Sequence, residues 1–190
     1  MPRLDRDRPD TAGPRGRAVL FWAAGMLLAA CASLPPGFAP PAGGGQVPGV
    51  PFHPQEDLQC GPASLAGVLN FLGDPVTPDQ IAAQVFRPDL RGSVSLDLAL
   101  YPRTRGFATR FFRGTPGDLV AAVDAGRPLV LMLDQGLGGV KVLHYVVLTG
   151  YRPEGVVVNS GRSQGVVLSW AGFLADWAGT GNWTLEVTRP

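Results

Sequence analysis

The stretch Gln55-Glu-Asp-Leu-Gln-Cys60-Gly-Pro-Ala-Ser64 decides the fold that this 190-residue chain is expected to adopt. It places a thiol directly before a Gly-Pro pair, and apolar residues with helical spacing follow over 65–72. Because proline is favoured in the first turn of a helix, we expect Cys60 at the start of that helix. Free N–H groups and the helix dipole stabilise a thiolate there. Gln55 is placed to donate a side-chain N–H to a developing oxyanion, so the stretch indicates a cysteine nucleophile.

The composition favours a globular domain and excludes several classes of function. Hydrophobic residues make up 45% of the chain, charged residues make up 16%, and the net charge is +1. These values allow a hydrophobic core and offer no basic surface for nucleic acid. The two histidines, His53 and His144, are far apart in the sequence, and neither Cys31 nor Cys60 lies in a CxxC motif. We therefore expect no metal site and no cofactor.

The N-terminus has the features of an export signal. Arginine-rich residues 1–17 precede an apolar run over 18–30, which is shorter than the roughly 20 residues that a membrane-spanning helix needs. The run ends in Leu28-Ala-Ala-Cys31, which resembles the bacterial lipobox. That resemblance implies a signal peptide over 1–30 and lipidation of Cys31, and the absence of Asp beside Cys31 favours the outer membrane of a Gram-negative envelope. The alternatives are a plain secretory signal or a short anchor, and an unlipidated Cys31 leaves a disulfide with Cys60 open.

The remaining chain divides into a tether and one domain. Residues 31–49 are dominated by proline and glycine, which predicts a flexible tether, and the folded domain is expected over 50–190. Helices are expected over 62–72, 77–85 and 115–125, with others starting at residue 93 or 95 and at 170. Apolar and alternating runs predict strands at 107–111, 129–133, 144–149, 155–159, 166–169 and 183–187. Helices followed by an antiparallel sheet are typical of the α+β class.

A cysteine nucleophile needs an imidazole within reach and a third group that orients it. His144 opens a predicted strand, and Asn159 ends the next one. The predicted turn at Pro153-Glu154 is about equally distant from both residues, so they are expected to be neighbours across a hairpin. This geometry favours His144 as the base and Asn159 as its orienting group, while His53 is expected to pack before the first helix.

Three motifs together resemble the C39-like cysteine peptidases: Gln55-x4-Cys60-Gly-Pro-Ala-Ser, His144-Tyr-Val-Val-Leu-Thr-Gly-Tyr151 and Val-Val-Val-Asn159. This group has a papain-like fold and is related to the double-glycine leader peptidases that mature bacteriocins. The resemblance covers about residues 50–187. It implies that Cys60 is the nucleophile, His144 the general base and Gln55 the oxyanion donor, together with the Cys60 N–H. The family commonly has Asp in the third position, where this chain is read as having Asn159, which lacks a charge to stabilise imidazolium.

The predicted function is therefore that of a cysteine peptidase acting on a peptide or protein in the bacterial envelope, anchored to the membrane by an N-terminal lipid. Leader peptidases of the resembling family usually form part of an ABC exporter, but this chain has no Walker A motif and no ATP-binding domain. Two alternatives stay open: an amidase or acyl-transferase with the same dyad, and a catalytically silent peptide-binding lipoprotein. Each site residue also has a structural alternative: Cys60 as a core thiol, His144 as a sheet-edge histidine and Asn159 as a turn residue.

Overall fold

The computed structural model describes residues 34–54, 59–87, 89 and 92–190. The predicted lipid site at Cys31 and the predicted oxyanion donor Gln55 lie outside the described residues. Among the helices in these ranges, none is long and apolar enough to cross a membrane.

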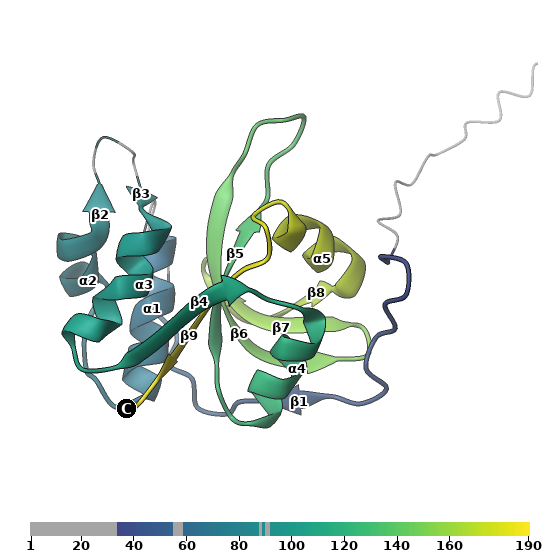
Figure 1. The fold of residues 1–190 in the computed structure, drawn as a ribbon, viewed down its shortest axis with the longest axis horizontal. Coiled ribbons are helices and arrows are strands. Elements are labelled where there is room, and N and C mark those ends of the chain that lie inside the picture. The colour runs from purple at the N-terminus through teal and green to yellow at the C-terminus, as the bar shows by residue number, and fades with distance from the viewer. Residues whose placement is uncertain (1–33, 55–58, 88, 90–91) are drawn as a thin grey trace, which may run out of the picture. The chain divides into compact units, whose positions relative to one another are not determined.

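The described residues contain a seven-stranded antiparallel sheet, which forms the centre of the domain (Figure 1). Its strand order is β4-β9-β5-β6-β7-β8, and the short strand β1 also pairs with β6. The central strands β5 and β6 are the apolar runs that the sequence predicts as strands, and most of their side chains are buried. The bounds are β1 Gly45–Gln46, β4 Ala108–Arg113, β5 Leu129–Asp134, β6 Leu143–Arg152, β7 Gly155–Ser160, β8 Ser163–Ser169 and β9 Trp183–Thr188.

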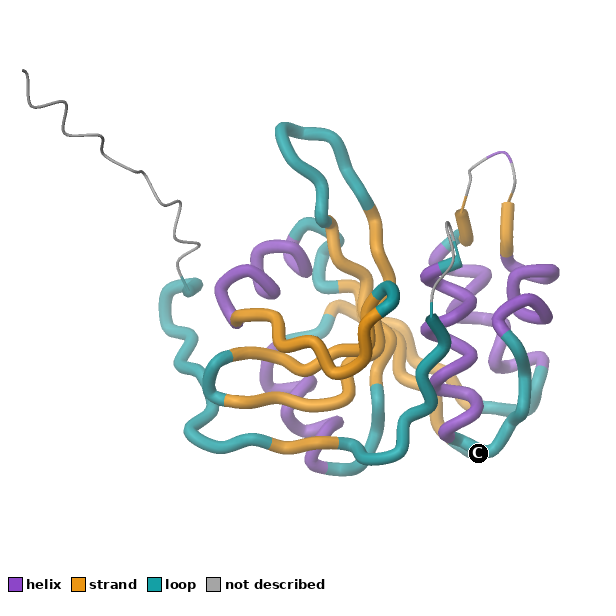
Figure 2. The backbone as a smooth tube through the Cα atoms, turned by 180° about the vertical axis from the view of Figure 1, so that it is seen from behind, coloured by secondary structure: helices purple, strands orange, loops and turns teal. Residues whose placement is uncertain are grey.

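Helices lie on both sides of this sheet. The first three gather on one side together with a small two-stranded ribbon, while α4 and α5 lie on the other side (Figures 1 and 2). Thr77 and Thr115 form capping boxes at α2 and α4, as the sequence predicts for α2. The predicted α+β class is confirmed. The bounds are α1 Cys60–Phe71, α2 Pro78–Val85, α3 Ser95–Thr104, α4 Pro116–Asp124, α5 Trp170–Ala178, β2 Phe86–Arg87 and β3 Gly92–Ser93.

A β-bulge at Thr149 changes the register between β6 and β7. Near the turn, Gly150 pairs with Val157, but on the other side of Thr149 the pairs are Leu148 with Val158 and Val147 with Asn159. Thr149 is therefore the extra residue of β6. One extra residue in a strand shifts its pairing with the neighbouring strand by one position. Beyond the bulge, each side chain therefore shares a face with a different set of residues of the neighbouring strand. The bulge decides which residue of β7 shares a face with His144.

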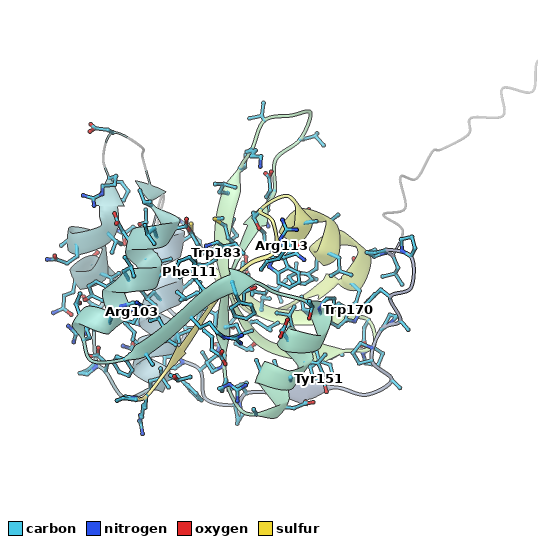
Figure 3. The ribbon with its side chains drawn as sticks, viewed as in Figure 1. Arg103, Phe111, Arg113, Tyr151, Trp170 and Trp183 are labelled. Atoms are coloured by element: carbon cyan, nitrogen blue, oxygen red, sulfur yellow. The ribbon has the colours of Figure 1, made fainter. Side chains whose placement is uncertain are left out.

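The N-terminal strap, residues 38–47, differs from the flexible tether that the sequence predicts over 31–49. Gly45 and Gln46 pair with β6, and the Val47 N–H donates to the Thr149 carbonyl at 2.8 Å. Phe38 packs against Trp170 of α5 with 5.2 Å between the ring centroids (Figure 3 labels Trp170). Backbone hydrogen bonds to a bulged strand and one aromatic contact thus hold a segment whose composition alone predicts no packing.

Candidate active site

Cys60 is the first residue of α1, the position that the Gly-Pro pair predicts for it. Gln59, the residue just before the helix, makes no side-chain cap, and the first turn of α1 has no acidic residue. By contrast, Thr77, Thr115 and Ser169 cap α2, α4 and α5. Neither Gln59 nor a residue of the first turn therefore neutralises the first N–H groups of α1 or the positive end of its dipole. Cys60 is a free, half-buried thiol at this end of the helix. The free backbone N–H groups at this position can donate to an oxyanion that forms beside the thiol.

The start of β6 lies against this end of α1. A Cβ atom added to Gly61 would lie 3.3 Å from the ring of Tyr145, so the helix and the strand approach closely only because residue 61 has no side chain. The Tyr145 ring is buried and also meets Trp183 edge to face at 5.6 Å. Burial, and then the charge of the nearby Cys60, raise the pKa of Tyr145 well above its ordinary value. The thiol is therefore next to the residue that follows His144.

His144 is the second residue of β6, and its ring is anchored on one side. The ring Nε2 lies 2.9 Å from the hydroxyl oxygen of Ser160, the last residue of β7. Burial lowers the pKa of His144, which favours the neutral imidazole that a general base requires. Because Nε2 is occupied by Ser160, Nδ1 is the nitrogen left to exchange a proton with a thiol.

Asn159 is not the residue that the structure brings to His144. The bulge at Thr149 pairs Asn159 with Val147, and side chains of paired residues share a face, so Asn159 and His144 point to opposite faces of the sheet. The Asn159 side-chain oxygen instead accepts a hydrogen bond from the Gly165 N–H at 3.1 Å, which supports an irregular point in β8. Its amide nitrogen is buried against α1 and the segment before it, beside a cavity of about 10 Å³ lined by Pro51, Phe52, His53, Ala63, Ser64, Val147 and Asn159.

Ser160 was not singled out by the sequence reasoning, and it differs chemically from the Asp and Asn considered for its position. A carboxylate only accepts, so it fixes the proton of the facing nitrogen and stabilises imidazolium. A hydroxyl both donates and accepts, and it carries no charge. Ser160 therefore fixes the orientation of the His144 ring but not its tautomer. His144 and Ser160 are 16 residues apart in the sequence. This spacing predicts that they face each other only if the bulge in β6 is already known.

The other sequence-predicted residues are placed as follows. Between Cys60 and His144, both described, there is no hydrogen bond, a common feature of catalytic pairs in proteins without a bound substrate. The Nε2 atom of the second histidine, His53, lies 2.7 Å from the side-chain oxygen of Asn70 in α1. His53 therefore packs the segment that precedes α1 onto this helix, which agrees with the structural role that the sequence predicts. In the described ranges, no group of three or more His, Cys, Asp or Glu side chains is arranged to hold a metal ion.

The site thus combines a thiol at the start of α1 with an imidazole that Ser160 anchors at the start of the central strand β6. The model of the Peptidase_C39 like family matches residues 47–184. The chain belongs to this family. The predicted C39-like resemblance is thereby confirmed, and the match begins within the strap, three residues before the predicted start of the domain at residue 50.

Solved structures show the same C39 peptidase fold. A protein from Bacillus anthracis described as a C39-like peptidase is 19% identical with a TM-score of 0.65, and the match covers 77% of this chain and 98% of that one. The peptidase domain of Streptococcus ComA, a bifunctional ABC transporter, is 20% identical with a TM-score of 0.63 and coverages of 75% and 100%. A double glycine motif protease from an AMS/PCAT transporter, solved with its leader peptide, is 24% identical with a TM-score of 0.60 and coverages of 77% and 95%. Curated proteins gave no match.

Proposed function

We propose that this C39-like protein is a cysteine peptidase that hydrolyses a peptide or protein through Cys60 and His144. The observation that carries the proposal is the imidazole of His144, anchored through Nε2 to Ser160 at 2.9 Å, on the strand whose next residue contacts the start of α1. This arrangement leaves Nδ1 available for the thiol of a nucleophile that begins a helix. Family membership supports peptide-bond hydrolysis as the reaction.

In the proposed reaction, His144 Nδ1 takes the proton from the Cys60 thiol, and the thiolate adds to the carbonyl carbon of the scissile amide. The oxyanion that forms is held by the Cys60 N–H and by the side chain of Gln55. The C–N bond then breaks as His144 returns the proton to the leaving amine, which leaves a thioester on Cys60. A water molecule, deprotonated by His144, hydrolyses the thioester and restores the free thiol.

The experiment that tests this proposal is labelling of the purified domain with a thiol-reactive probe across pH. Because Cys60 is a free cysteine and His144 is its proposed base, we expect rapid labelling near neutral pH that His144→Ala shifts to alkaline pH. Cys60→Ala should abolish labelling, because the domain over 50–190 contains no other cysteine. Labelling that occurs only at alkaline pH, and equally fast without His144, would contradict the enzyme and favour a silent peptide-binding protein.

We further propose that the protein acts in the bacterial envelope, tethered by a lipid on Cys31. The support is the sequence Leu28-Ala-Ala-Cys31 after an apolar run too short to span a bilayer. Cells that express the full chain should incorporate radiolabelled palmitate into it, and Cys31→Ser should remove that label. Palmitate incorporation that survives in Cys31→Ser, or absence of label in the unaltered chain, would contradict the anchor.

A further inference from the structure

The hairpin arm, residues 134–143 between β5 and β6, carries the most exposed apolar side chains of the described residues. Leu137 is 90% exposed, Val140 69%, Val142 53% and Leu143 50%. Single exposed apolar residues are normal, but several on one short segment mark an interaction site. The backbone of the arm extends beyond the other elements of the sheet (Figures 1 and 2), in keeping with the exposure of these four side chains.

The arm has a defined conformation that holds these side chains in place. Gly138 and Gly139 both have positive φ, +64° and +87°, and Leu137 bridges to Val140 across them, as in a two-residue hairpin turn. At the base, Asp134 Oδ1 accepts hydrogen bonds from the backbone N–H groups of Gly136, at 3.1 Å, and Val142, at 3.0 Å. A side chain on Gly136 would collide with the carbonyl oxygen of Val140, so the two halves of the arm pack closely. The exposed residues belong to a preformed ribbon.

The charges on the arm favour a peptide over a lipid surface. Its charged residues are Asp134 and Lys141, and both are directed to its base. Lys141 Nζ donates to the Gly179 carbonyl at 3.0 Å and lies 4.0 Å from the Asp134 carboxylate. Binding to an anionic membrane relies on clustered basic side chains and interfacial aromatic residues, whereas the arm has one lysine, which is hydrogen-bonded to Gly179, and no aromatic residue. The most exposed side chains of the arm, Leu137 and Val140, are aliphatic, and its one cation, Lys141, is held near the base while its side chain stays 65% exposed.

The arm leads directly into the proposed catalytic histidine, and the adjoining part of β6 has an open edge. Pairing of β6 with β7 ends at Val147 and Asn159, so Leu143 is paired with β5 alone among the described strands. The Val142 carbonyl accepts from Gln135 on the β5 side, and backbone groups alternate sides along a strand, so those of Leu143 point away from β5. An extended peptide can add to such an edge through main-chain hydrogen bonds, one residue from His144.

We propose that the hairpin arm docks an extended, aliphatic segment of the substrate, which pairs with the open edge at Leu143 and packs against the exposed Leu and Val side chains of the arm. This proposal rests on the proposed peptidase function for its link to catalysis, but the docking itself does not require a reactive thiol. It assigns the substrate class as peptides with an alternating aliphatic pattern beside the scissile bond.

The test is peptide binding in the Cys60→Ala background, where no turnover can occur. The probe is an acetylated, amidated peptide of alternating Leu and Thr flanked by Lys, compared with a counterpart in which Ser replaces Leu. Leu137→Ser with Val140→Ser should weaken binding of the Leu peptide at least about tenfold by calorimetry, because two aliphatic contacts are lost. Val167→Ser, which alters a 39% exposed valine on β8, is the matched control and should bind like the parent.

Two results would overturn the proposal. One is equal binding of the Leu and Ser peptides, or of the Leu peptide to parent and double variant. The other is an effect of the double variant on binding to phosphatidylglycerol vesicles with no effect on the peptide, which would make the arm a membrane contact. Thiol labelling reports separately on the reaction, so peptide binding without labelling would retain the docking site and reject the peptidase.

Discussion

Replacing His144 with alanine is expected to lower peptide turnover by roughly 10²–10⁴-fold, the usual contribution of a general base. His144 is the residue proposed to remove the Cys60 proton, and the second histidine of the chain, His53, is bound to Asn70 and cannot substitute for it. Turnover can be measured by mass spectrometry on a peptide library prepared from a digested proteome. His144→Gln provides a second variant, since it removes the base while retaining a polar group of similar size.

We also expect His144→Gln to change how activity and stability depend on pH. Burial lowers the pKa of His144 below its unfolded value of about 6.5, so the neutral base, and with it the activity, should persist to pH values below 6.5. As pH falls through this window the unfolded chain binds a proton first, so the free energy of unfolding decreases. His144→Gln should remove this decrease, while His53→Gln should leave the acid limb of activity in place. If the loss of activity at low pH is unchanged in His144→Gln, it is caused by the titration of another group.

The sequence predicts the class of the fold and most of its elements because these depend on local patterns. The Gly-Pro pair after Cys60 predicts the helix start to within two residues, and the apolar runs at 129–133 and 155–159 are strands in the structure. Cys60 and His144 are predicted from the chemistry of their residue types alone, which requires no knowledge of the fold. The packing of α1 on β6, which brings Cys60 close to Tyr145, involves residues far apart in the sequence and is not visible in any local pattern.

Sequence patterns did not predict Ser160 as the orienting residue because of the bulge at Thr149, and they did not predict the strap because its composition indicates no packing. Counting residues from the turn in a regular hairpin puts Asn159 on the face of His144, and one extra residue in β6 exchanges it for Ser160. The same Thr149 presents the carbonyl that binds Val47 of the strap. No residue type in 147–150 predicts a bulge. The bulge is stabilised by contacts of β6 with β7 and with the strap, and not by local propensity.

Replacing Ser160 with aspartate is expected to raise the pKa of His144 by about 1 to 3 pH units, the usual effect of a carboxylate beside a cation. Ser160 is half-buried and its hydroxyl lies 2.9 Å from His144 Nε2, so a short carboxylate at this position faces the same nitrogen. It would accept the Nε2 proton, fix Nδ1 as the base and stabilise the imidazolium formed in the reaction. Turnover near neutral pH should therefore rise, whereas Ser160→Ala should reduce it by releasing the ring.

Asn159→Asp is the matched control, because it adds the same carboxylate one residue away on the opposite face of the sheet. It should leave the pKa of His144 nearly unchanged and should destabilise the fold, since residue 159 is 4% exposed and an unpaired buried charge is costly. The pKa can be followed by NMR titration of the imidazole in a His53→Gln background, where His144 is the sole histidine. A larger shift in Asn159→Asp than in Ser160→Asp would mean that Asn159 faces the imidazole and that β6 and β7 pair without the bulge at Thr149.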